Sequence, residues 1–171
     1  YIHVNSILGE GSTFEVVIRL CPSQEQRMTE EPERVICLSD CINRFAGKRV
    51  LLVEDNAINM EIAHAILEEE HLDIAEARNG KEALEIFRNS KTGEYDFIIM
   101  DVMMPVMDGL EATKAIRELE REDAKKIPII AMTANAFRED KEKCLAAGMN
   151  AHLAKPIKIE NIKRILCEYC V

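Results

Sequence analysis

From Lys48 onward, short apolar runs alternate with longer segments in which apolar residues recur at helical spacing. The apolar runs occupy residues 49–53, 73–77, 96–100, 127–132 and 151–154. In the runs around 50–53 and 98–100 polar residues do not alternate with apolar ones, which is typical of strands buried on both faces. Five strands, each followed by a helix, predict an α/β domain with a doubly wound parallel sheet and right-handed crossovers.

The helical segments are predicted at residues 57–70, from 81, at 110–121, at 135–147 and from 159. Three polar residues, Asn56, Asn79 and Asp108, stand where they can cap helix starts. Gly148 follows a helix end in the usual left-handed position. The last helix should turn a stripe toward the sheet, formed by Ile159, Ile162 and Leu166.

Charge and cysteine usage limit the function classes. The chain has 22 basic and 31 acidic residues and a net charge of -9, which argues against nucleic-acid binding. The six cysteines are scattered through a chain of ordinary domain size, so we predict reduced thiols and a cytoplasmic location. Cys167 and Cys170 have metal-like spacing but no second pair, so a zinc site is not predicted. No apolar run reaches membrane-spanning length, and no charged-then-apolar leader opens the sequence.

The first 47 residues have a different character. Residues 2–6 and 13–20 are predicted to be two strands of a hairpin joined by the turn residues of "LGEGS". Residues 21–47 are polar and acidic, with two prolines, and are predicted to be a linker. Because the first residue is Tyr1, we expect the chain to be part of a longer protein.

Polar residues follow the predicted strands where ligands bind in a doubly wound sheet, at the carboxyl ends. These residues are Glu54, Asp55, Asp101, Thr133 and Lys155. Three carboxylates at one edge repel one another unless a cation lies among them. With oxygen donors and no His or Cys in the set, Mg²⁺ suits the cluster better than zinc.

The remaining groups fit a phosphoryl site. The ammonium of Lys155 and the hydroxyl of Thr133 are suited to the oxygens of a bound phosphoryl group. Asp101 is then the nucleophile, forming an acyl phosphate. Each residue also has an ordinary structural interpretation: a solvated strand end, a helix cap, or a surface lysine before Pro156.

Four stretches, "LLVEDNAIN", "IIMDVMMPVMDG", "IIAMTANA" and "HLAKPI", resemble the receiver domain of two-component response regulators. The resemblance covers residues 48–171 and implies a flavodoxin-like five-stranded parallel sheet of order 2-1-3-4-5 with five helices. It also implies that Asp101 is the phosphoacceptor, and that Glu54, Asp55, Asp101 and the Met103 carbonyl hold Mg²⁺. Thr133 and Lys155 would contact the phosphoryl group, and the bond between Lys155 and Pro156 would be cis.

Two positions depart from the commoner pattern of that family. His152 stands three residues before Lys155, where a switching aromatic is usually Tyr or Phe. A histidine there weakens the aromatic half of the switch, responds to protonation, or is a partly buried residue with no switching role. Glu54 replaces the commoner first aspartate and keeps the charge.

The predicted hairpin resembles the last hairpin of the ATP-binding domain of sensor histidine kinases, through Gly9, Gly11, Ser12 and Phe14 of a "GxGSxF" turn. This resemblance implies three parts: residues 1–20 from an ATP-binding domain, a linker at 21–47, and a receiver at 48–171. That order is typical of a hybrid sensor histidine kinase. Two isolated strands need cover, so we expect the hairpin to pack on the receiver or to pair with another chain.

Three functions remain open at this point. The first is a receiver that takes a phosphoryl group from a phosphohistidine, on its own kinase core or on a histidine phosphotransfer protein. The second is a receiver-like module that binds proteins without being phosphorylated. The third is a phosphohydrolase of the haloacid dehalogenase type, which wants a second aspartate two residues after the nucleophile, where this chain has Met103.

Overall fold

The computed structural model describes residues 2–7, 9, 11–17, 45–133 and 138–169. The chain divides into two compact units, Tyr1–Val35 and Ile36–Val171.

The first unit contains the predicted hairpin. Strands β1 (Ile2–Ile7) and β2 (Gly11–Val16) pair antiparallel, and every residue in both is exposed. The second strand therefore begins two residues earlier than predicted, and residues 18–20 lie outside the described part. Gly9 and Gly11 have positive φ angles of 87° and 122°, which a glycine adopts without strain at such a turn.

The second unit is built on a parallel sheet of five strands in the order β4-β3-β5-β6-β7. These strands are β3 (Arg49–Val53), β4 (Asp73–Ala77), β5 (Phe97–Asp101), β6 (Ile129–Thr133) and β7 (Ala151–Ala154). In the numbering of this unit alone the order is 2-1-3-4-5, so the predicted topology is confirmed. Strands β5 and β6 are buried throughout, as runs without polar alternation require.

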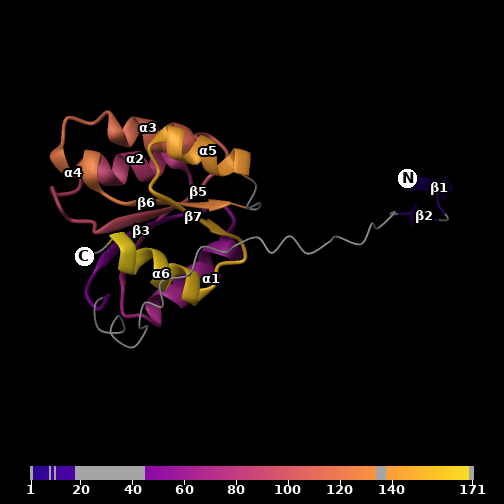
Figure 1. Cartoon of the computed structure of the whole chain (residues 1–171), viewed down its shortest axis with the longest axis horizontal. Helices are drawn as coiled ribbons and strands as arrows, with labels where there is room; N and C mark the ends of the chain where they lie inside the picture. The colour runs from indigo at the N-terminus through magenta and orange to yellow at the C-terminus, as the bar shows by residue number, and fades with distance from the viewer. Residues whose placement is uncertain (1, 8, 10, 18–44, 134–137, 170–171) are drawn as a thin grey trace, which may run out of the picture. The chain divides into compact units, whose positions relative to one another are not determined.

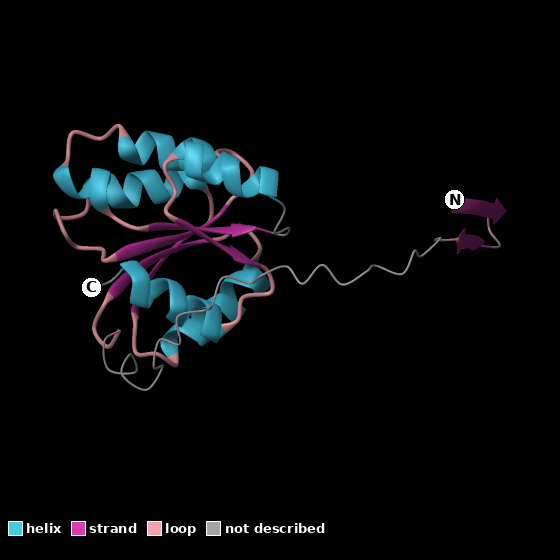
Figure 2. Cartoon of the chain, in the orientation of Figure 1, coloured by secondary structure: helices cyan, strands magenta, loops and turns pink. Residues whose placement is uncertain are grey.

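Helices cover both faces of the sheet (Figure 1). On one face α1 (Ala57–Glu68) and α6 (Ile159–Tyr169) pack on Leu52, Ile99 and Ile130. On the other face lie α2 (Gly80–Asn89), α3 (Gly109–Arg117) and α5 (Arg138–Ala147). Figure 2 shows the resulting three layers, with the strands between two layers of helices. Successive residues of each strand alternate between the two cores, so the sheet separates them.

The helix predicted at 110–121 is wrong in its extent. It ends at Arg117, and a separate short helix, α4 (Glu122–Lys126), follows. Arg121 leaves the helical path with φ -133°, and its guanidinium donates to the carbonyls of Ser90 and Lys91 at 3.1 and 3.0 Å. Those carbonyls follow the end of α2, so a tertiary contact overrides the local helical pattern. The described residues of this unit thus hold six helices where five were predicted.

The predicted helix caps are confirmed. Asn56, Asn79 and Asp108 each accept hydrogen bonds from backbone amides in the first turns of α1, α2 and α3. Gly148 has φ 99° after the last residue of α5. In α6, Ile162 is buried as predicted and Ile165 joins it, while the Leu166 side chain lies outside the described residues.

The prediction of reduced thiols is wrong for Cys167, which is disulfide-bonded. The other cysteine in the described part, Cys144, is free and buried in the core.

Candidate functional site

The carboxyl ends of the strands bring three of the predicted site residues into direct contact. Glu54 follows β3, Asp101 ends β5 and Lys155 follows β7. The Lys155 ammonium nitrogen lies 2.5 Å from Glu54 Oε2 and 2.6 Å from Asp101 Oδ2, so one cation bridges the two carboxylates. Residues more than 50 positions apart meet here because parallel strands end at the same edge of the sheet.

Asp55 completes an acidic set. A carboxylate oxygen from each of Glu54, Asp55 and Asp101 lies within 4.8 Å of the others. Glu54 is 1% exposed and Asp101 5% exposed, whereas Asp55 is exposed. The cluster therefore has two acids in the protein interior and one at the solvent-facing rim.

Burial and charge shift the proton affinities of this cluster. Desolvation by burial raises the pKa of Asp101 above its usual value, although the hydrogen bond and charge of Lys155 act against this, and Glu54 adds to the rise. Burial lowers the pKa of Lys155, but its hydrogen bonds to Asp101 and Glu54 outweigh burial and the pKa is raised. Lys155 is thus held protonated beside the two carboxylates.

Asn59, on the first turns of α1, is a part of the site that the sequence analysis missed. Its side-chain amide donates to Glu54 Oε1 at 3.0 Å, and the Asn56 backbone amide lies 3.4 Å from the same oxygen. Glu54 therefore has a fixed orientation, with Lys155 on one oxygen and amides on the other. Asn59 lies in the stretch "LLVEDNAIN", but on a helix and not directly after a strand, where the other polar site residues lie.

The loop after β5 packs against the nucleophile candidate. The Met103 amide donates to Asp101 Oδ1 at 3.2 Å, and the Gly109 amide donates to the Val102 carbonyl at 3.0 Å. A Cβ atom on Gly109 would collide with the Asp101 carbonyl oxygen. Only glycine therefore lets the start of α3 approach the backbone of Asp101 this closely.

Thr133 and Lys155 are joined through the backbone. The Lys155 amide donates to the Thr133 carbonyl at 2.8 Å, and the predicted cis peptide bond between Lys155 and Pro156 is confirmed. Thr133 is buried and lies one residue beyond Met132, which pairs with Asp101 in the sheet. His152 lies on β7, and its pKa is lowered by burial and then by the charges of Lys141 and Arg164.

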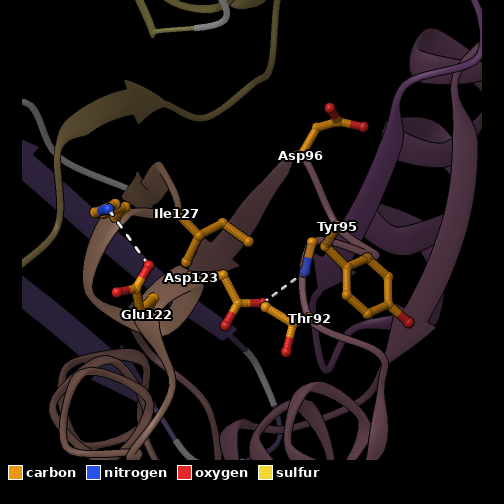
Figure 3. A pocket seen from close by; sticks show the side chains of 8 residues that line it. Thr92, Tyr95, Asp96, Glu122, Asp123 and Ile127 are labelled. Atoms are coloured by element: carbon orange, nitrogen blue, oxygen red, sulfur yellow. Dashed lines mark hydrogen bonds and ion pairs between the residues drawn. The ribbon is translucent and has the colours of Figure 1, made fainter.

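A surface cavity of about 430 Å³ lies elsewhere in the unit (Figure 3). It is lined by Thr92, Tyr95 and Asp96, which precede β5, and by residues of and after α4 such as Asp123 and Ile127. The cavity is therefore at the amino ends of the strands, whereas Asp101 is at the carboxyl end of β5. Asp123 there accepts hydrogen bonds from Arg121 and from the Gly93 amide, so that carboxylate is occupied in structural contacts.

The fold and the site together define a doubly wound domain with a cluster of acidic residues and a lysine at its sheet edge. The family model of the response regulator receiver domain matches residues 50–166. The chain belongs to this family, and its receiver domain is a component of two-component phosphorelay signalling.

Solved receiver domains agree with this assignment. The receiver domain of the sensor histidine kinase PA1611 from Pseudomonas aeruginosa, with magnesium coordinated in its active-site cleft, is 41% identical with a TM-score of 0.64. The alignment covers 72% of this chain and 98% of that one. The receiver domain of Ssk1 from Saccharomyces cerevisiae, solved in complex with the histidine phosphotransfer protein Ypd1, is 34% identical with a TM-score of 0.65. That alignment covers 73% of this chain and 90% of the other.

Among curated relatives, hybrid signal transduction histidine kinase I of Dictyostelium discoideum is 42% identical over 133 residues, which is 74% of this chain and 8% of the relative. Histidine kinase 5 of Arabidopsis thaliana is 32% identical over 184 residues, covering 94% of this chain and 19% of the relative. The chain thus spans less than a fifth of either protein. None of the helices in the described residues is long and apolar enough to cross a membrane.

Proposed function

We propose that Asp101 accepts a phosphoryl group from a phosphohistidine in a reaction that depends on Mg²⁺. The observation that carries this proposal is the bridge from Lys155 to Asp101 and Glu54, at 2.6 and 2.5 Å, in a chain of the receiver family. Lys155 counteracts the rise that burial causes in the pKa of Asp101, and so favours the carboxylate form that acts as a nucleophile. It also places a positive charge where the phosphoryl oxygens arrive.

The acidic set fits a magnesium ion. Its donors are all oxygens, three of them lie within 4.8 Å of one another, and the exposed Asp55 leaves one side open to water or a phosphoryl oxygen. Glu54, Asp55 and Asp101 would hold the ion, together with the Met103 carbonyl that the family resemblance adds. When bound, Mg²⁺ supplies neutralisation of the charge that develops on the transferred group.

The protein's own residues then promote the transfer mainly by positioning the reacting groups and by neutralising charge. An Asp101 carboxylate oxygen attacks phosphorus in line with the phosphohistidine nitrogen, so that a P–O bond forms as the P–N bond breaks. The donor imidazole leaves with the bonding electron pair and takes up a proton. Lys155 and the Thr133 hydroxyl bind phosphoryl oxygens, and the Met103 amide holds Asp101 in orientation through Oδ1.

Phosphorylation by a small donor tests this proposal. The full chain is incubated with acetyl phosphate, with and without Mg²⁺, and its intact mass is followed. We expect one added phosphoryl group with Mg²⁺ in the unmodified chain and in Asp73→Asn, an exposed aspartate on β4, and none in Asp101→Ala. Addition that persists in Asp101→Ala would contradict the assignment of the nucleophile. Steady turnover of phosphoesters would instead favour the hydrolase, and no addition at all would favour the binding module.

An apolar surface beside the site suits a protein donor. Ile58 and Ile62, one turn apart on α1, are exposed, as are Met103 and Val106 in the loop after β5. Exposed apolar residues grouped near a pocket are typical of protein interaction sites. A receiver of this family is solved in complex with a histidine phosphotransfer protein, so we assign these four residues, here called the docking residues, to contact with such a donor.

Comparing phosphotransfer from a protein donor with phosphorylation by acetyl phosphate distinguishes binding of the donor protein from the reaction at Asp101. We expect Ile58→Ser and Ile62→Ser to slow transfer from phosphorylated Ypd1, used as a probe, while acetyl phosphate still modifies Asp101 at the unmodified rate. Leu145→Ser, at an exposed apolar position on α5, serves as the control. Equal transfer to the Ile58 variant and to the control would rule out this docking surface.

The parts before the receiver support a hybrid histidine kinase as the whole protein. The alignment with histidine kinase 5 leaves 6% of the chain unmatched, about ten residues, so it extends into the predicted hairpin segment of residues 1–20. We therefore include in the proposal an ATP-binding domain remnant at 1–20, a linker at 21–47 and the receiver at 48–171. In such a protein, in the cytoplasm, the phosphohistidine donor is either the chain's own kinase core or a phosphotransfer protein.

A further inference from the structure

The loop of residues 102–108 connects β5 to α3 and carries Met103, yet its backbone is not relaxed. Val106 has a φ of 71°, and a β-branched residue rarely adopts this left-handed conformation. Such conformations are strained and persist where surrounding contacts impose them. The contacts that shape this loop are therefore candidates for a role in positioning the site.

One of these contacts comes from a different helix. Gly80 is the first residue of α2, and its amide donates to the Met107 carbonyl at 3.1 Å. The Asn79 side chain caps the same helix through the Glu82 amide, which leaves the Gly80 amide pointing out of the helix toward the loop. The start of α2 thus fixes the loop directly.

Glycine is also the only residue type that fits at position 80, between the start of α2 and the 102–108 loop. A Cβ atom at Gly80 would lie 2.7 Å from the Met107 carbonyl oxygen, 2.9 Å from the Asp108 carbonyl oxygen and 2.8 Å from the Ala112 Cβ. Two of these three atoms belong to the backbone of the loop, which cannot give way as a flexible side chain does. An alanine would therefore displace the loop or α2.

We propose that Gly80 is a positioning residue for the phosphoacceptor site, acting through the 102–108 loop. Its hydrogen bond and its close approach hold Met107 and Asp108, and the loop in turn sets the position of Met103. The Met103 amide donates to Asp101, and its carbonyl is one of the proposed magnesium ligands. The effect of Gly80 on magnesium binding rests on the proposed function, whereas its effect on the position of the loop does not.

Two measurements on the full chain test this role in Gly80→Ala. Calorimetric titration gives the Mg²⁺ affinity, which we expect to fall about tenfold, as is typical when a group that orients metal ligands is altered. Hydrogen exchange at the Gly109 amide, which closes the loop onto Val102, is measured without metal and should become faster. The control is Phe87→Leu, at the far end of α2, which disturbs the same core but should change neither quantity.

A double variant separates the loop from simple helix packing. Gly80→Ala combined with Ala112→Gly removes the clash with α3 but leaves both carbonyl clashes. We expect it to bind Mg²⁺ as weakly as Gly80→Ala. Recovery of affinity in the double variant, or unchanged affinity and exchange in Gly80→Ala, would overturn the proposal. If the unmodified chain fails to bind Mg²⁺, the proposed function is contradicted, and the exchange at Gly109 still decides the role of Gly80.

Discussion

Glu54 shows how a single buried carboxylate is held in one orientation by its neighbours. Lys155 contacts one of its oxygens and Asn59 donates to the other. A hydrogen bond to a charged group contributes about 1.5–3 kcal/mol, so the Asn59 amide matters for a side chain that water hardly reaches. Asn59 is therefore the residue at which the order of the site can be tested without changing a proposed ligand.

We expect Asn59→Ala to lower the free energy of unfolding by about 1–2 kcal/mol without metal, because Glu54 loses a donor. Asn59→Asp has the same shape but sets a like charge against Glu54, so it should be less stable than Asn59→Ala. Added Mg²⁺ should narrow that difference, since a cation screens the two acids. Urea unfolding with and without Mg²⁺ measures both effects. Equal stability of the two variants without metal would contradict this account of Glu54.

The surroundings of His152 predict the sign of a pH dependence in the stability of the receiver. Its pKa in the folded state is lowered by burial and by Lys141 and Arg164, so the unfolded chain binds more protons over the range just below the ordinary value near 6.5. Stability therefore rises with pH there, and is lost as pH falls from above 6.5 through the lowered folded pKa.

We expect the urea concentration at the unfolding midpoint to decrease as the pH is lowered from about 7.5 to about 5.5, a range that spans the ordinary histidine pKa. His152→Phe introduces an aromatic residue that is commoner at this position in the family. The midpoint of this variant should decrease less over the same pH range. His3→Gln, on the hairpin, is the control and should follow the unmodified chain. A pH profile for His152→Phe identical to that of His3→Gln would exclude His152 as the source.

The individual site residues were largely predictable because they depend on strand direction alone. Once the apolar runs are taken as parallel strands, Glu54, Asp101 and Lys155 must meet at one edge of the sheet. Asn59 and Gly80 were not predictable in this way. Their roles depend on how the starts of α1 and α2 approach the strand ends, which no local pattern specifies.

At the scale of the elements, two arginines on the α3–α4 segment fix how helices meet. Arg117 donates to the carbonyls of Gly148 and Ala124 at 3.0 and 2.7 Å and to Asn150 Oδ1 at 2.9 Å. Arg121 binds the carbonyls after α2. Most of these partners lie 30 to 33 residues from the arginine that binds them. Because the local sequence does not show such contacts, the prediction of one continuous helix at 110–121 missed the break between α3 and α4.

Replacing Arg117 by lysine tests this arrangement. A lysine has one ammonium and cannot reach three acceptors in different directions, so partly buried acceptors lose their donors. We expect Arg117→Lys to lose about 2–3 kcal/mol of unfolding free energy. Arg88→Lys, at an exposed position on α2, is the matched control and should change little. A loss no larger than in the control would show that the Arg117 contacts do not stabilise the α3–α4 region.

At the scale of the whole molecule, the hairpin is the part that the receiver does not explain. Its register places Ile2 opposite Val16 and Val4 opposite Phe14, all exposed, while the opposite face pairs His3 with Glu15 and Asn5 with Thr13. A two-stranded ribbon with one bare apolar face is marginal in water, so this face needs a partner. The sequence indicated the two strands, but not what covers them.

We propose that in this chain the apolar face of the hairpin drives self-association. Sedimentation over a range of concentrations should show association of the full chain and none for a chain of residues 36–171, which holds the receiver unit. Phe14→Ser should weaken association, because it removes the largest side chain of that face, whereas Thr13→Ser on the opposite face should not. Since all proposed site residues lie between Glu54 and Lys155, both shortened and full chains should still bind Mg²⁺ equally. Association that survives Phe14→Ser, or that persists in residues 36–171, would assign the contact to the receiver instead of the hairpin.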